Sequence, residues 1–343
     1  MARASSSWAC RVASFALALA AIPACSREAP PTAHVTAASD SPEYAIVWGD
    51  SPLGVRSYWI ELSHGQARVI AQLRGALFLS QGRLYRWHPL QRIQHVLNVC
   101  PDSPEPNGED SDQPKGAATP DDSQRAITVY GAEAERLDAE GHVRIVNPPD
   151  VEHATSFGNT VELLGSVGSL LFIGDSTDAL YCDAAHGLSS YSRDTFDLVK
   201  GEFTPPTKAE LAELRELALR SQRAALLACL AQRSNADGQP YGADALEQLE
   251  LNSAQPVLSA SGQLAFELDL SFMHSYVEGV VSCPVTVEMR KPPPRFAPPR
   301  ALAKFRELEP KTQVHGWSTL APGEQALVPT ISRVFAERAQ HDE

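Results

Sequence analysis

The sequence predicts an α+β protein, in which a β-meander N-terminal half leads into an antiparallel sheet packed against one long helix. Short β-prone runs follow one another from Tyr44 to Cys100. Large apolar residues alternate with Ala, acidic residues and Ser from Leu264 to Phe272, and an apolar stripe at helical spacing runs from Leu211 to Cys229. Of the 343 residues, 43% are hydrophobic, which is enough for one large core or two medium ones.

The first residues predict an export signal. Arg3 and Arg11 flank a short polar start, and an apolar run from Val12 to Ile22 follows. This run is about half as long as a helix that crosses the hydrocarbon core of a bilayer. We therefore expect residues 1–24 to be a cleavable signal peptide rather than a permanent anchor.

The end of this run resembles the lipobox of bacterial lipoproteins, in which a dedicated peptidase cuts ahead of an invariant cysteine. Ile22, Ala24 and Cys25 match it, and Pro23 stands where a small residue is usual. The resemblance implies lipidation of Cys25, with ordinary secretion as the alternative. Several acyl chains there would hold the protein on a membrane, since one chain binds only marginally. Ser26, not Asp, follows, which implies the outer membrane, on its periplasmic face or at the cell surface.

Residues 25–43 are rich in Pro, Ala, Ser and Thr without apolar periodicity, which predicts a flexible tether. The whole chain has a formal net charge of −13, and loss of Arg3 and Arg11 with the signal makes the mature chain more acidic. This charge argues against nucleic acid as a partner and against a polybasic membrane contact. It favours a basic partner.

Residues 44–155 are expected to form a β-rich region. Gly65, Gly82 and Gly141 each stand just ahead of a β-prone run, as tight hairpins require, because glycine takes positive φ without steric cost. Within this region, residues 101–124 are acidic and proline-rich, and we expect a disordered, solvated insertion. A calcium loop is the alternative, but Pro104 and Pro106 break the alternation of ligands that an EF-hand needs.

Residues 156–290 are expected to form an α+β domain, and residues 291–343 a Pro-rich linker with a C-terminal helical extension. Thr207 and Glu210 have the spacing of a capping box. They predict the start of the long helix, which runs to about Gln232 and buries one face. A last helix is expected near residues 325–339.

Six cysteines are present. Cys10 leaves with the signal and Cys25 is the expected lipid site. Four remain, and an even number in an exported chain predicts two disulfides, for which three pairings are open. Free buried thiols are the alternative, and a zinc site has none of the usual spacing. The cysteines in question are Cys100, Cys182, Cys229 and Cys283.

No catalytic motif of the common nucleophile, phosphate-loop or helical zinc types occurs, and we predict no metal and no cofactor. The best cluster of polar side chains surrounds Cys182 and includes Asp183, His186 and Asp197. These residue types suit acid–base chemistry or ligand binding. They are also typical of turns, where Asp and Gly are favoured for backbone reasons.

The same segment carries a resemblance to a known family. Tyr181-Cys182-Asp183-Ala184-Ala185-His186-Gly187 is followed by Thr195-Phe196-Asp197-Leu198-Val199-Lys200-Gly201-Glu202, a helix and a closing hairpin. Over about residues 160–290 this resembles an uncharacterised envelope domain. One member is the extracellular part of a lysozyme-sensing anti-sigma factor, and another belongs to a peptidoglycan deacetylase. The resemblance implies a fold and a binding surface, but no catalytic residues.

We therefore expect a non-enzymatic lipoprotein of the cell envelope that binds a protein or cell-wall ligand. A basic envelope protein such as a lysozyme-like enzyme would suit the acidic charge. The alternatives are an envelope hydrolase with a site around His186 and a purely structural lipoprotein.

Overall fold

The structure is a computed structural model. It describes residues 41–97, 124–151, 154–182, 187–205, 207–234, 238–258, 264–275, 279–289 and 296–340. The predicted signal peptide, Cys25, most of the tether and nearly all of the acidic loop lie outside these ranges. Residues 41–343 form one unit of contacts, and everything below concerns this unit.

The predicted α+β fold with one long helix is wrong. Strands make up 56% of the described residues and helices 23%, in several sheets with only short helices. The segment predicted as one helix forms α1 (Lys208–Ser221) and α2 (Arg223–Ala231). At the junction the Ser221 hydroxyl donates a hydrogen bond to the Leu217 carbonyl over 2.7 Å, a contact that often bends helices. The apolar stripe continues across this break, because both helices bury apolar residues in the same core. The stripe alone therefore predicts one continuous helix.

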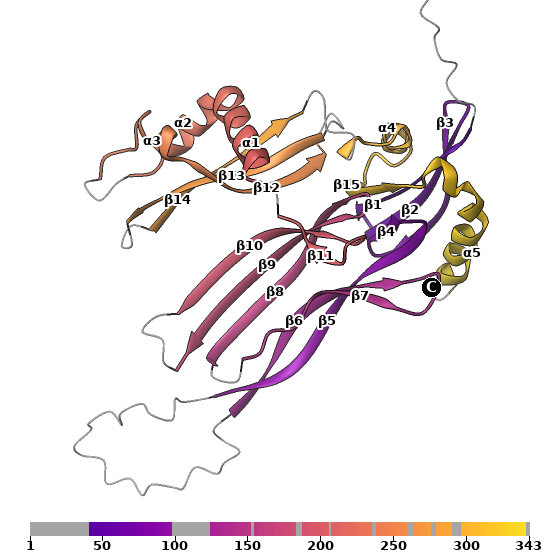
Figure 1. Ribbon diagram of the computed structural model, residues 1–343, viewed down its shortest axis with the longest axis horizontal. Coiled ribbons are helices and arrows are strands. Elements are labelled where there is room, and N and C mark those ends of the chain that lie inside the picture. Colours follow the sequence, from indigo (N-terminus) through magenta and orange to yellow (C-terminus); the bar gives the residue numbers. More distant parts are fainter. Residues whose placement is uncertain are drawn as a thin grey trace, which may run out of the picture. The chain divides into compact units, whose positions relative to one another are not determined.

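The largest sheet has eight strands in the order β11-β10-β9-β8-β15-β1-β2-β3 (Figure 1). The pairs are antiparallel except that β15 runs parallel to β8. Because β15 also pairs with β1, a strand from the C-terminal region joins the first strands to β8–β11. The strands are β1 (Glu43–Ser51), β2 (Gly54–Ser63), β3 (Gln66–Arg74), β8 (Ala154–Val167), β9 (Leu170–Tyr181), β10 (Leu188–Asp197), β11 (Glu202–Phe203) and β15 (Gln313–Thr319).

Two smaller sheets complete the strands. One has the order β4-β5-β6-β7 and the other β12-β13-β14. The hairpins between β2 and β3 and between β4 and β5 turn at Gly65 and Gly82, which have φ of 75° and 68°, as predicted. The strands are β4 (Leu77–Ser80), β5 (Arg83–Leu97), β6 (Gln124–Arg136), β7 (His142–Val146), β12 (Glu250–Leu258), β13 (Leu264–Ser275) and β14 (Gly279–Glu288).

The remaining helices are short. Figure 1 shows α1 and α2 lying along one face of the three-stranded sheet, and α5 contacts β3. No helix in the described part of the chain is long and apolar enough to cross a membrane. The helices are α3 (Ala245–Gln248), α4 (Arg300–Leu308), the 3-10 helix η3 (Pro322–Leu327) and α5 (Val328–Ala339), the last of which occupies the segment expected to be helical.

Successive residues of β1, β2 and β9 supply cores on opposite faces of the eight-stranded sheet, as the two-residue period of a strand requires. Phe172 belongs to the core shared with α1, α2, α4 and the three-stranded sheet. Leu171 and Ile173 belong to the core shared with the four-stranded sheet. Farther along the same sheet, Trp59 packs with α5.

Two of the four predicted disulfide cysteines pair with each other. Cys229 of α2 and Cys283 of β14 form a disulfide that fastens the helix to the three-stranded sheet. Cys182 is also disulfide-bonded. Cys100 lies outside the described residues.

Candidate ligand-binding site

An apolar pocket of about 360 Å³ lies between the eight-stranded sheet and the layer formed by α1 and β12–β14. Its size is within the usual range for ligand pockets. Its walls come from β9, β10, α1, β12 and β13, together with the segments that precede α1 and follow β14. The lining residues are Leu170, Phe172, Thr195, Asp197, Lys200, Thr204, Pro205, Thr207, Glu210, Glu213, Leu214, Leu217, Ala254, Pro256, Phe266, Met289 and Phe296.

The inner wall is aromatic and aliphatic. Phe172 is 4% exposed on β9, and Phe266 is 6% exposed on β13. Phe296 meets Phe266 edge to face, with ring centroids 5.9 Å apart, a favoured geometry for aromatic pairs. Leu214 and Leu217 of α1 are only partly buried. The helix therefore covers the pocket without filling it.

The capping box holds α1 at one side of the pocket. The Glu210 backbone N–H donates to Thr207 Oγ1 over 3.2 Å, and the Thr207 backbone N–H donates to Glu210 Oε2 over 2.9 Å. This confirms the predicted start of the helix. Two free backbone N–H groups of the first turn are satisfied, which fixes where the helix enters.

A turn at the end of β10 forms another side of the pocket. Asp197 Oδ1 accepts a hydrogen bond from the Val199 backbone N–H over 2.9 Å, and Gly201, with φ of 71°, donates its N–H to the Asp197 carbonyl. Lys200 Nζ lies 3.9 Å from Asp197 Oδ2. The Asp197 carboxylate thus organises the turn and adds negative charge beside the pocket.

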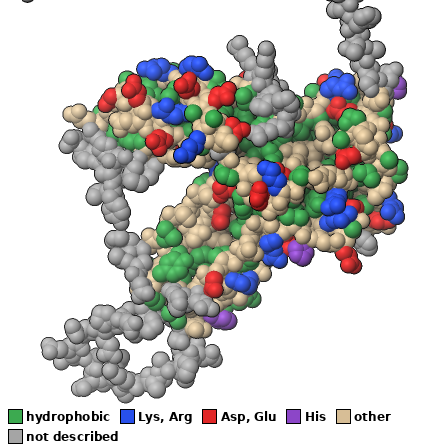
Figure 2. All heavy atoms as spheres, viewed as in Figure 1, with side chains coloured by type: hydrophobic (Ala, Val, Ile, Leu, Met, Phe, Trp, Pro, Cys, Tyr) green, Lys and Arg blue, Asp and Glu red, His purple; other side chains and the backbone are tan. Residues whose placement is uncertain are grey.

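The polar lining is acidic overall. Asp197, Glu210 and Glu213 contribute three carboxylates, against the single ammonium group of Lys200. A pocket with apolar walls and an acidic rim suits a ligand that carries an apolar group next to a positive charge. On the face drawn in Figure 2, acidic and basic side chains are intermixed. The excess of carboxylates over ammonium groups is therefore a local property of the pocket rim.

The candidate residues named from the sequence are placed as follows. Asp197 lines the pocket. Asp183 and His186 lie outside the described residues. The apolar lining was missed because Phe172, Leu214, Phe266 and Phe296 are far apart in sequence, and each one alone has the pattern of an ordinary core residue.

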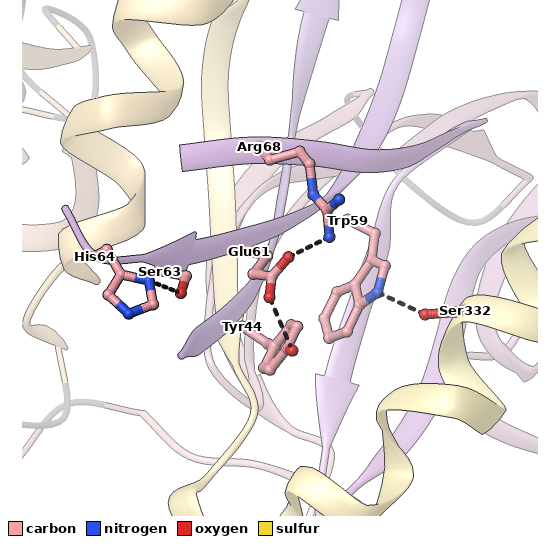
Figure 3. Close-up of polar contacts among 7 residues, drawn as sticks. All are labelled: Tyr44, Trp59, Glu61, Ser63, His64, Arg68 and Ser332. Atoms are coloured by element: carbon pink, nitrogen blue, oxygen red, sulfur yellow. Dashed lines mark hydrogen bonds and ion pairs between the residues drawn. The ribbon is translucent and has the colours of Figure 1, made fainter. Parts of the chain in front are cut away.

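A second polar cluster ties β1, β2 and β3 together (Figure 3). The Tyr44 hydroxyl and the Arg68 guanidinium both donate to the Glu61 carboxylate. Burial, with a smaller contribution from Glu61, raises the pKa of Tyr44. Trp59 stacks on Tyr44 and donates its indole N–H to Ser332 Oγ of α5 over 3.1 Å. The polar groups of Tyr44, Trp59, Glu61 and Arg68 each have a partner within the fold. We therefore interpret this cluster as structural, with the Trp59–Ser332 hydrogen bond connecting α5 to the sheet.

Ser63 and His64 form a hydrogen bond of 2.9 Å between Ser63 Oγ and His64 Nδ1 (Figure 3). The pairing of a hydroxyl with an imidazole suggests a nucleophile and its base. However, the two residues are neighbours in the β2–β3 hairpin, and His64 has a φ of 51°. The contact is a local feature of an exposed turn.

Asp175 of β9 is an acid in an unfavourable environment. Its Oδ1 is buried and has no hydrogen-bond partner among the described residues. Burial raises the pKa of Asp175, and the nearby carboxylate of Asp194 raises it further. Asp194 itself accepts a hydrogen bond from Ser192 Oγ over 2.8 Å. Burial thus disfavours the ionised form of the Asp175 carboxyl group.

Metal binding has no support within the described ranges, where no three His, Cys, Asp or Glu side chains gather as ligands would. No protein-family model, no curated protein and no solved structure matches the chain. The case for function therefore depends on the pocket and on the sequence.

Proposed function

We propose that this chain is a non-enzymatic binding lipoprotein of the bacterial cell envelope, held on the outer membrane through Cys25. The apolar pocket beneath α1 is the single observation that carries the binding role. It combines an aromatic and aliphatic wall with an acidic rim. The ligand is a protein or cell-wall component that presents an apolar group beside a positive charge.

Two features of the sequence support this proposal. The lipobox-like segment ending at Cys25 accounts for the membrane anchor, and the net charge of −13 favours basic partners. In addition, the segment that resembles the envelope domain includes Asp197 and Lys200, which line the pocket. A lysozyme-like enzyme, which is basic, is our first candidate partner.

The test is a binding measurement on residues 26–343 without lipid, using a panel of lysozyme-like enzymes. Alkylammonium ions and alkyl carboxylates of matched length serve as small probes. We expect saturable, salt-sensitive binding of a basic enzyme or of the ammonium series, and none of the carboxylates. Equal binding of both probe series, or binding of neither probes nor enzymes, would refute the proposal.

Matched variants locate the binding. Ala254 of β12 lines the pocket, so Ala254→Phe fills it and should abolish binding. Ala212→Phe places the same group on the exposed side of α1 as a control. Similarly, Glu213→Lys reverses a rim charge, whereas Glu216→Lys makes the same change on α1 outside the pocket lining. Equal effects of Glu213→Lys and Glu216→Lys would mean that the rim does not select the ligand.

A further inference from the structure

The outer edge of β10 makes few backbone hydrogen bonds, although part of β10 also lies close to β12. β11 pairs with β10 only at Phe196 and Asp197, and the Thr204 N–H reaches the Thr195 carbonyl. The backbone N–H and C=O groups of successive residues point to opposite edges of a strand. Thr195 points away from β9, so the backbone groups of Ser189, Tyr191 and Arg193 also point away from β9. Among the described residues, no backbone hydrogen bond reaches them from that side.

Three other edge strands of the protein, β3, β12 and β14, carry features that discourage an added strand. The edge strand β3 has a register shift against β2, where Trp59 pairs with Ala71 and Ile60 pairs with Val69. In the three-stranded sheet, β12 has a register shift between Leu251 and Ser253 and contains Pro256, and β14 contains Pro284. Proline, bulges and covering helices are the usual means of blocking an edge. Leu188–Asp197 has neither a proline nor a register shift against β9.

A polar cleft of about 730 Å³ lies beside this edge. It is bounded by β10 from Tyr191 to Asp194 and by β12, β13 and β14. Arg193 is its single basic residue, and Asp194, Glu267 and Asp269 are its acids. Arg193 Nη1 lies 3.8 Å from Glu267 Oε2, and Ser282 Oγ donates to Asp269 Oδ1. The cleft is therefore acidic, and its polar groups lie next to unpaired backbone.

Exposed apolar side chains accompany the open edge. Leu188 is 54% exposed and Tyr191 57%. The Arg193 guanidinium lies 5.5 Å from the centre of the Tyr191 ring and donates to the Tyr191 hydroxyl. This pair places an exposed aromatic ring and a guanidinium group beside the edge of β10.

We propose that the edge of β10 from Ser189 to Arg193 binds an extended basic segment of a partner protein by strand addition. The backbone of the segment pairs with the outward N–H and C=O groups of β10, as in other edge-strand complexes. Its alternate side chains face the cleft, where lysine or arginine lies near Glu267 and Asp269. This site is separate from the pocket beneath α1 and does not depend on its function.

The test uses synthetic peptides with the mature chain, residues 26–343. The probes are a Thr-Lys alternating octapeptide, its Thr-Glu counterpart, and the Thr-Lys peptide N-methylated at alternate residues. We expect saturable binding of the Thr-Lys peptide at low salt, with slowed amide exchange at Tyr191 and Arg193. We expect binding about tenfold weaker or worse for the other two peptides.

Substitutions in β10 separate backbone pairing from side-chain attraction. Tyr191→Pro removes an outward N–H without removing a hydrogen bond to β9, so it should abolish binding of the Thr-Lys peptide. Tyr191→Ala keeps the backbone and should weaken binding only a few-fold. Ala254→Phe, which fills the pocket beneath α1, should leave binding of the Thr-Lys peptide unchanged. A failure of strand addition at β10 can therefore be distinguished from a failure of ligand binding in the pocket.

Several results would overturn the proposal. The first is unaltered binding of the Thr-Lys peptide to a folded Tyr191→Pro variant, or equal binding of the N-methylated peptide to the wild type. The N-methylated peptide decides the matter if Tyr191→Pro fails to fold. Absence of binding with unchanged exchange at Tyr191 also overturns it. So does a concentration-dependent dimer that Tyr191→Pro abolishes, because a second copy would then occupy the edge.

Discussion

The two faces of the eight-stranded sheet are covered in different ways. On one face, α5 and the four-stranded sheet pack closely, with Trp59, Phe196 and Phe335 at 2% exposure or less. On the other face, α1, α2 and the three-stranded sheet leave a pocket of about 360 Å³. Both faces have a buried core, but the first is closed by buried side chains, whereas the second also leaves accessible apolar surface beside α1.

The disulfide is the largest expected contributor on the pocket side. Cys229 and Cys283 are 54 residues apart, and closing a loop of that size stabilises a fold by about 4 kcal/mol in the chain-entropy model. The double variant Cys229→Ala and Cys283→Ala should lose about that much, measured by urea unfolding. Hydrogen exchange should rise in α1, α2 and β14 more than in β1 and β2. A uniform rise would show that the two faces are not independent.

Equivalent truncations on the two faces test the comparison directly. Ile331 of α5 is 2% exposed, and Ile331→Ala should cost about 3 kcal/mol through lost burial and a new cavity. Leu217 of α1 is partly buried beside the pocket. Leu217→Ala should cost about half as much, because its side chain already lacks neighbours on the pocket side. Equal losses in urea unfolding would contradict the difference between the faces.

The capping box at the edge of the pocket is expected to have a smaller effect. Thr207→Ala removes the hydroxyl that accepts from the Glu210 N–H, and loss of an N-cap costs about 1 kcal/mol. Because α1 forms one wall, the same variant should also weaken binding of the alkylammonium probe. The control is Thr207→Ser, which keeps the hydroxyl. A Ser variant as impaired as the Ala variant would exclude capping as the cause.

Two acids should respond to pH with opposite signs. Burial and Asp194 raise the pKa of Asp175 above its ordinary value of 3.8, so its ionised form destabilises the fold at neutral pH. The free energy of unfolding of Asp175→Asn should exceed that of the wild type at pH 7 by less than about 1 kcal/mol after solvent screening. The difference should vanish as the pH falls below 3.8.

Asp138 is the counterpart of Asp175, because its pKa is shifted in the opposite direction. Hydrogen bonds from Arg136 hold the pKa of Asp138 below 3.8. The stability it contributes is present above that value and is lost as the pH falls through its folded pKa. Asp138→Asn should therefore be less stable than the wild type at pH 7 and equal to it in strong acid. Thermal unfolding across pH 2–7 tests both variants. If Asp175→Asn and Asp138→Asn changed stability at pH 7 in the same direction, the pKa directions assigned to Asp175 and Asp138 would be contradicted.

Local features of the fold could be predicted from the sequence, whereas its arrangement could not. The turns at Gly65 and Gly82 and the capping box at Thr207 depend on a few adjacent residues, and each has the predicted geometry. The single long helix was wrong because the break depends on the Ser221 side chain and on packing. Of the residues that line the pocket, Asp197 is the one that the sequence predicts as a candidate ligand residue, whereas Thr207 and Glu210 are predicted only as a helix cap.

The sequence by itself determined the alternation of β13, the hairpin turns, the start of α1, and the acidity that favours a basic ligand. The tertiary structure decided that β15 lies between β1 and β8, that α1 stands over an unfilled pocket, and that β10 keeps an open edge. The reason is physical. Turns and caps are made by neighbours along the chain, but pairing partners, pockets and edges depend on residues up to several hundred positions apart.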